Sequence, residues 1–120
     1  MANPNNCIVL QGRLAHEPDL RYIGEYNTPA LTFDLIVYDY YSKSDKEEKN
    51  QKIRVKKFGN GADNIAENIM VGQQIQVLGS LKIDSRDKGK GFYPWVRADI
   101  IRLGMKPLGY YKNKWKNEKT

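Results

Sequence analysis

Apolar and polar residues alternate through most of this chain, and only one segment changes to helical spacing. Alternation is typical of strands with one buried face, because successive side chains of a strand point to opposite sides. The segment that changes is residues 60–71, whose apolar residues recur at helical spacing and predict one helix of about three turns. The predicted strands are residues 6–14, 31–41, 51–58, 74–84 and 92–103.

This order predicts an all-β protein with one short helix, a five-stranded OB-fold barrel with the order β-β-β-α-β-β. Gly12 supports a barrel, because a glycine within a strand marks a bulge or bend that lets the strand pass between sheet layers. We expect Asn60 to cap the helix and Gly72 to take a left-handed conformation after it. Residues 20–23 should be extended, and residues 42–50 should form a charged hairpin loop.

The length of 120 residues predicts one domain, which we place at residues 1–104 and follow with a short basic and aromatic tail at residues 105–120. Within the predicted strand 74–84, one face is apolar and should enter the core. That face consists of Ile75, Val77, Gly79, Leu81 and Ile83. Pro94 in the last strand indicates a sheet edge or a bulge.

Cysteine and histidine are scarce, with one of each in the chain, at Cys7 and His16. An internal disulfide is therefore excluded, and the usual zinc sites and catalytic triads lack their ligands. We predict no metal and no cofactor, a small buried role for Cys7 near a subunit contact, and a surface or interface role for His16. No apolar run approaches the roughly 20 residues of a membrane span, so we expect a cytoplasmic protein without membrane contact.

A net charge of +6 and a pI near 9.4 favour polyanionic partners. The predicted strand 51–58 places Lys52, Arg54, Lys56 and Phe58 on the face opposite its apolar side chains. Two interpretations are open at this point. The cations and the ring suit a phosphate backbone with bases to stack, and they equally suit the solvated outer face of an ordinary strand.

Four stretches resemble bacterial single-stranded DNA-binding proteins, and together they span residues 6–103 in register. They are NCIVLQGRLAHEPDLRY, LTFDLIV, the long segment IRVKKFGNGADNIAENIMVGQQIQVLGSL, and YPWVRADIIRL. The most specific pattern is GRL-x3-P-x-LRY in combination with GQ-x5-GSL. The resemblance implies an OB barrel that assembles as a tetramer, with a dimer as the alternative, and binds single strands on aromatic and basic side chains.

The resemblance and the basic face together define a set of expected contacts to single-stranded DNA. The set is Arg13, Arg21, Tyr22, Tyr38, Tyr41, Lys52, Arg54, Lys56, Phe58, Lys82, Arg86, Tyr93 and Trp95. Lys52 and Arg86 stand where many family members carry tryptophan. Arginine still stacks on a base while lysine supplies mainly charge, so we expect phosphate contacts to dominate and the salt dependence to be steep.

The leading hypothesis is a non-enzymatic, sequence-tolerant binder that protects single-stranded DNA in replication, recombination or repair. The alternative is a replication-restart adaptor of the same fold that bridges DNA and a helicase or primase partner. Family members typically end in an acidic, apolar tip, whereas this chain ends in the basic KNEKT, as a short relative from a mobile element or a shortened chain would. A nuclease is not expected, because no paired carboxylates for metal ions occur. RNA binding stays open.

Overall fold

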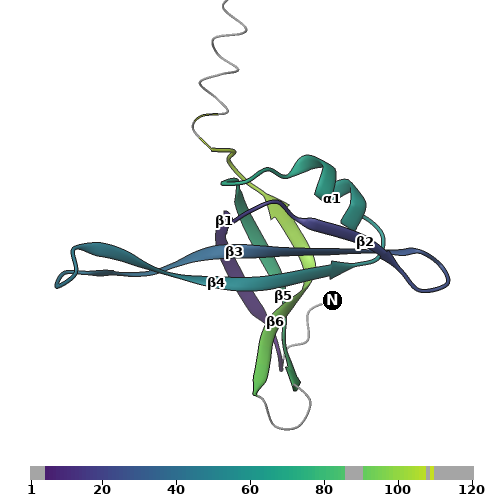
Figure 1. Cartoon of the computed structure of the whole chain (residues 1–120), viewed down its shortest axis with the longest axis horizontal. Coiled ribbons are helices and arrows are strands. Elements are labelled where there is room, and N and C mark those ends of the chain that lie inside the picture. Colours follow the sequence, from purple (N-terminus) through teal and green to yellow (C-terminus); the bar gives the residue numbers. More distant parts are fainter. Residues whose placement is uncertain (1–4, 86–90, 108, 110–120) are drawn as a thin grey trace, which may run out of the picture.

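A computed structural model describes residues 5–85, 91–107 and 109. The described residues form one six-stranded sheet and one short helix, arranged around a single core (Figure 1). In chain order the elements are β1 (Ile8–Leu14), β2 (Asp19–Ile23), β3 (Thr28–Ser42), β4 (Glu47–Phe58), α1 (Ala62–Asn68), β5 (Gln74–Ser85) and β6 (Phe92–Leu103). The predicted all-β OB-fold barrel is confirmed, and the extended segment that we expected near residue 20 forms the additional strand β2.

The barrel closes because β1 pairs with two strands that lie far apart in the sheet. The strand order is β1-β5-β6-β4-β3-β2, and β1 also pairs with β3 at Arg13 and Leu14. Gly12 lies where β1 passes from β5 to β3, and a Cβ atom there would lie 2.3 Å from the carbonyl oxygen of Ile36. The role predicted for this glycine, a strand that crosses between layers, is confirmed.

The core is built from the faces that alternation predicts on most strands. Ile53 and Val55 point inward from β4, opposite the cations of the same strand, and Ala62 of α1 is fully buried against the barrel. The buried apolar residues are Leu14, Leu31, Phe33, Leu35, Val55, Ala62, Ile69, Ile75, Val77, Val96 and Ala98. Helix α1 packs on β2 and β3 and covers one end of the core.

The helix is shorter than predicted, and its start differs from the expectation. Gly61, with φ of 94°, occupies the N-cap position, and no side chain caps the helix, so the role predicted for Asn60 is wrong. Ile69 is extended and ends the helix, although apolar spacing continues beyond it. Gly72 has a φ of 87°, as predicted, but it lies in the turn before β5, where its amide donates to the carbonyl of Leu14 at 2.8 Å.

The segment predicted as a charged loop at residues 42–50 is mostly strand. Strand β3 continues to Ser42 and β4 begins at Glu47, so the connection is limited to residues 43–46. The resulting β3–β4 hairpin projects beyond the barrel (Figure 1). Both faces of such a hairpin are in water, so alternation between apolar and polar residues, the signal for a half-buried strand, is not required there.

The β5–β6 hairpin also leaves the barrel, and this overturns part of the predicted core (Figure 1). Leu81 and Ile83 are 41% and 60% exposed, although alternation placed them inward. Gly79, by contrast, is buried as predicted, because a Cβ atom there would lie 1.9 Å from the carbonyl oxygen of Arg97. The register shift next to Gly79 marks a bulge, at which the hairpin bends out of the barrel wall.

The segment after β6 continues along the barrel for a short distance. The amide of Gly104 donates to the carbonyl of Gln74, and the amide of Gln74 donates to the carbonyl of Met105, both at 2.8 Å. Most of the predicted tail at residues 105–120 lies outside the described residues, and the domain boundary stays a prediction. Cys7 is exposed, so its predicted burial is wrong for the single chain.

Candidate nucleic-acid interface

Strand β4 presents three cations on the outside of the barrel, which we call the cation row (Lys52, Arg54 and Lys56). They alternate with Ile53 and Val55, which point into the core, so the period of the strand separates the charges from the apolar side chains. The position of the cation row on the outer face is as predicted.

A second wall faces the cation row, and it comes from the β5–β6 hairpin. Strands β4 and β6 run parallel and pair at Val55–Val96 and Lys56–Arg97, which places Trp95 beside Lys56. Between the walls lies an open groove of about 660 Å³, which we call the β4–β6 groove. Its lining residues are Asp34, Lys52, Arg54, Lys56, Asp84, Tyr93, Pro94 and Trp95.

Trp95 is held in the β4–β6 groove by three neighbours. Its indole Nε1 donates a hydrogen bond to Oδ2 of Asp84 at 2.8 Å. The ring of Phe58 meets it edge-on, with centroids 6.4 Å apart and planes at 76°. The ammonium of Lys56 lies 4.8 Å from the centroid of the indole, within the range of a cation–π interaction. These contacts order a large aromatic surface next to the ammonium of Lys56.

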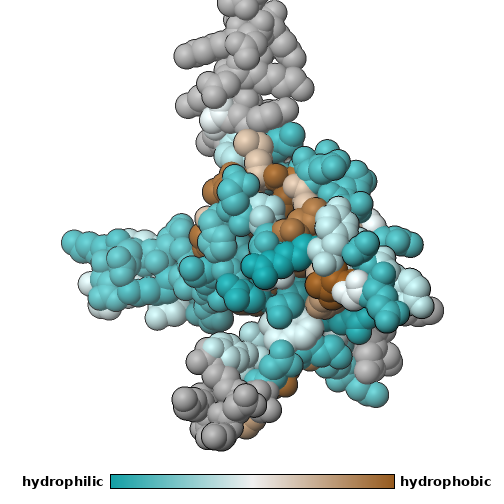
Figure 2. Space-filling model, turned by 45° about the vertical axis from the view of Figure 1, so that its right-hand side comes forward, coloured by the Kyte–Doolittle hydropathy of each residue, from teal (hydrophilic) through white to brown (hydrophobic). Residues whose placement is uncertain are grey.

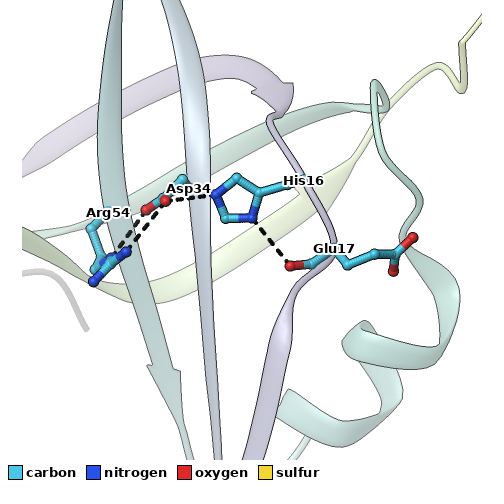
Figure 3. A network of polar contacts seen from close by, with 4 residues as sticks. All are labelled: His16, Glu17, Asp34 and Arg54. Carbon is cyan, nitrogen blue, oxygen red and sulfur yellow. Dashed lines mark hydrogen bonds and ion pairs between the residues drawn. The ribbon is translucent and has the colours of Figure 1, made fainter.

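Asp34 lies beneath the cation row and links Arg54 to His16 (Figure 3). The Nε of Arg54 lies 3.1 Å from Oδ1 of Asp34, and the Nε2 of His16 lies 2.8 Å from Oδ2. The Nδ1 of His16 faces the carbonyl oxygen of Glu17 at 3.3 Å, so both histidine contacts are hydrogen bonds at once only when the ring carries two protons. This network was not predicted from the sequence.

The environment of Asp34 stabilises its ionised form. Burial raises the pKa of this carboxyl, but the hydrogen bonds from Arg54 and His16 and their charges outweigh burial, so the pKa lies below its usual value. The same contact with Asp34 raises the pKa of Arg54. Arg54 is therefore a cation whose charge is partly balanced within the protein, whereas Lys52 and Lys56 have no carboxylate partner among the described residues.

A smaller hollow continues the outer face beyond the cation row. It has a volume of about 280 Å³ and is lined partly by Arg13, Ile36 and Tyr38. Arg13 donates to the carbonyl of Gly72 at 3.1 Å, and Tyr38 is 57% exposed. Tyr41 lies farther out on the β3–β4 hairpin, opposite Glu48. The face of the hairpin that is visible in Figure 2, where it projects to the left, is mostly hydrophilic.

The structure brings some of the predicted contact residues together and separates others. Lys52, Arg54, Lys56, Tyr93 and Trp95 line the β4–β6 groove, Phe58 packs on Trp95, and Lys82 is the cross-strand neighbour of Trp95. Arg21 and Tyr22 lie on β2, which is separated from β4 by β3, and Arg21 forms an ion pair with Asp19 at 2.9 Å. Arg86 lies outside the described residues.

Two carboxylates of the β4–β6 groove, Asp34 and Asp84, were missed as site residues. Asp34 stands directly opposite Arg54 in the β3–β4 register, but a register shift between Tyr38 and Tyr40 lies between this pair and the turn, so counting back from the turn would have set Asp34 opposite Val55. Asp84 meets Trp95 diagonally across the β5–β6 hairpin, and no local signal in the sequence marks that contact. The part of the chain that the structure describes holds no cluster of metal-binding side chains and no helix long and apolar enough to cross a membrane.

The barrel topology and the β4–β6 groove define an OB-fold protein with a basic and aromatic outer groove. A family model described as "Single-strand binding protein family" matches residues 5–99, and the chain belongs to this family. It is 36% identical over 107 residues to Single-stranded DNA-binding protein 1 of Xylella fastidiosa (strain 9a5c), covering 87% of this chain and 77% of that protein.

Two further relatives agree with this assignment. The single-stranded DNA-binding protein of Caldanaerobacter subterraneus subsp. tengcongensis is 30% identical over 101 residues, with 82% of this chain and 67% of that protein covered. The crystal structure of wild-type single-stranded DNA binding protein from Thermus aquaticus superposes with a TM-score of 0.69 at 27% identity, covering 87% of this chain. The chain spans about half the length of the Thermus protein, 52%.

Proposed function

We propose that this protein binds single-stranded DNA with little dependence on sequence and without catalysing a reaction. The β4–β6 groove carries the proposal, because it sets three cations against the rings of Tyr93 and Trp95. Cations that neutralise phosphates release counterions, and exposed rings stack unpaired bases. The names of the relatives from Xylella, Caldanaerobacter and Thermus support the same function.

Duplex DNA is the disfavoured ligand, because its bases are already stacked on one another and are not free to stack on the ring of Trp95. A protein with this preference covers exposed strands during replication, recombination or repair, and acts at the nucleoid in the cytoplasm. The adaptor role with a helicase or primase gains no support from the fold, the groove or the relatives, so we do not adopt it.

We further propose that the protein acts as a homo-oligomer. Strand β1 pairs with β3 only at its last two residues, and no other described strand pairs with that edge of residues 8–12, so we infer that a second copy pairs there. On the outer face, Val9 pairs with Leu78 and Leu78 with Ile100 across three strands, and Val9 and Ile100 are 57% and 46% exposed. Such a row of apolar side chains is favourable to bury between copies. Light scattering that gives the mass of a single chain would contradict the proposal.

The function is tested by titrating labelled oligo(dT) and a duplex of equal length at two salt concentrations. We expect tight binding to the single strand, weak binding to the duplex, and a logarithmic salt slope of about 0.7 for each phosphate contacted. Equal affinity for the two ligands, with both abolished by salt, would contradict the proposal and indicate a general polyanion surface.

Two neighbouring lysines of β4 provide a matched pair of variants. Lys56 faces the indole of Trp95, whereas Lys57 points to the other side of the strand and donates to the carbonyl of Asp99 at 3.0 Å. Lys56→Gln should weaken binding to oligo(dT) several-fold and lower the salt slope. Lys57→Gln removes the same charge, keeps a donor for Asp99, and should change binding much less. An equal effect of the two variants would mean that the β4–β6 groove is not the binding surface.

A further inference from the structure

Asp84 is an acidic side chain in a groove that otherwise suits an anionic ligand. It lines the β4–β6 groove, and its Oδ2 accepts the indole hydrogen of Trp95 at 2.8 Å. Of the residues that the structure describes, Trp95 alone bonds to this carboxylate. An ionised carboxylate has about four acceptor positions and no donor, so the indole hydrogen of Trp95 uses only part of its capacity to accept hydrogen bonds.

The two carboxylates of the groove differ in what they face. Asp34 is buried and accepts hydrogen bonds from Arg54 and His16. Asp84 is exposed, and its one partner among the described residues is uncharged. A carboxylate repels the phosphates of a bound strand, so Asp84 is unfavourable for backbone contacts. It is favourable for groups that donate hydrogen bonds, and in DNA those groups are on the bases.

The bases differ in the donors that they present. Cytosine carries the N4 amino group, adenine the N6 amino group and guanine the N2 amino group, all of which a carboxylate accepts well. Thymine has no amino group, and the carbonyl oxygens O2 and O4 flank its single N3 hydrogen. A carboxylate that approaches N3 therefore meets two further acceptors, which repel it.

We propose that Asp84 makes the groove prefer bases with an exocyclic amino group, cytosine foremost among the pyrimidines, over thymine at the position that stacks on Trp95. The inference rests on the proposed binding of single-stranded DNA. Because Asp84 is bonded to the edge of the indole, a base stacked on that ring has its own edge close to the carboxylate. Asp84 thus adds a selective contact to a surface on which phosphate contacts and stacking are sequence-tolerant.

A purely structural role for Asp84, namely holding the indole of Trp95, is separable from this one. Asp84→Asn keeps an oxygen that accepts the indole hydrogen, so the ring keeps its orientation. The substitution removes the negative charge and adds an amide donor that matches O4 of thymine. A structural role alone leaves the ratio of cytosine to thymine affinity unchanged in this variant, whereas a base contact changes it.

The test measures dissociation constants for oligo(dC) and oligo(dT) of equal length at one salt concentration. From wild type to Asp84→Asn, we expect the dC/dT affinity ratio to fall roughly five-fold, the effect of one ordinary hydrogen bond. Glu67→Gln, on the exposed face of α1, removes the same charge outside the groove and should leave the ratio unchanged. An unchanged ratio in Asp84→Asn, with both strands bound, overturns the inference and leaves the proposed function intact.

A second measurement needs no variant. A strand of 2-pyrimidinone nucleotides lacks the amino group of cytosine but keeps its ring nitrogen and O2. Wild-type protein should bind it more weakly than oligo(dC), by a similar factor. Equal affinity for these two strands overturns the inference even if Asp84→Asn fails to fold. If wild-type protein binds none of the single strands, the proposed function itself is wrong.

Discussion

Asp34 and Arg54 stand directly opposite each other on β3 and β4, and the guanidinium donates to both oxygens of the carboxylate. The Nε atom lies 3.1 Å from Oδ1, and an Nη2 hydrogen bond of 3.4 Å reaches Oδ2. The side chain of Asp34 is only 9% exposed, while that of Arg54 is 57% exposed. The middle cation of the cation row is therefore anchored from below and still open to a ligand.

The first prediction concerns stability. Asp34→Asn keeps the size of the side chain but loses charge-assisted hydrogen bonds, so the free energy of unfolding should fall by about 1.5 kcal/mol near pH 7. Urea unfolding of both proteins measures the difference. Asp63→Asn on α1 is the matched control. Among the described residues, Asp63 accepts one hydrogen bond, from the adjacent backbone amide of Asn64, so this substitution should change the free energy of unfolding little.

The same pair predicts a pH dependence. The pKa of Asp34 in the folded protein lies below the value of about 3.9 in an unfolded chain, so the unfolded state binds more protons between the two values. The stabilisation by Asp34 is therefore fully present above about pH 4 and is lost as the pH falls through the folded pKa. The difference between wild type and Asp34→Asn should shrink on acidification. A difference that grows toward acidic pH would contradict this assignment.

A further prediction concerns the electrostatic attraction between the β4–β6 groove and the phosphates of DNA. Without the carboxylate of Asp34, the full charge of Arg54 is available to phosphates. Asp34→Asn should therefore bind oligo(dT) more tightly at low salt, and its logarithmic salt slope should rise by up to about 0.7. Binding titrations over a range of salt concentrations provide the measurement. A lower slope would show that Asp34 serves Arg54 by positioning it.

Trp95 should contribute to binding mainly through its aromatic surface. Trp95→Ala should weaken binding to oligo(dT) by about 1–3 kcal/mol, the usual effect of removing one stacking ring, while Trp95→Phe should retain much of the affinity. Fluorescence anisotropy of labelled DNA follows both variants. Tyr26, which is 90% exposed and does not line the groove, gives the control Tyr26→Ala. Equal losses of affinity for oligo(dT) in Trp95→Ala and Tyr26→Ala would argue against the β4–β6 groove as the binding surface.

The closure of the barrel depends on Gly12. Gly12→Ala places a Cβ atom 2.3 Å from the carbonyl oxygen of Ile36, so β1 and β3 must separate. We expect the free energy of unfolding to fall by about 1–3 kcal/mol or more. Thermal unfolding compares this variant with Gly109→Ala, for which no atom of the described residues lies within 4 Å of the added Cβ atom. A wild-type melting temperature for Gly12→Ala would mean that the crossing has more room than the structure shows.

Properties that depend on the period of one strand were readable from the sequence. Alternation separated the cation row from Ile53 and Val55, and it located the last strand at residues 92–103, the bounds observed for β6. The burial that alternation predicted for Leu81 and Ile83 was wrong. Alternation indicates which residues share a face of a strand, but it does not indicate where the strand leaves the barrel. The same limit explains the projecting end of the β3–β4 hairpin, residues 38–50, which is mostly strand although none of its residues is buried.

The sequence by itself determined the order of strands and helix, the composition of the core on most strands, and the side of β4 that carries charge. Each of these follows from short-range spacing, in which backbone geometry alone sets the direction of side chains. Only the tertiary structure decided that β6 runs parallel to β4, that Trp95 therefore lies beside Lys56, and that two carboxylates enter the same groove. Those contacts join strands whose pairing depends on barrel closure, and no local pattern encodes that pairing.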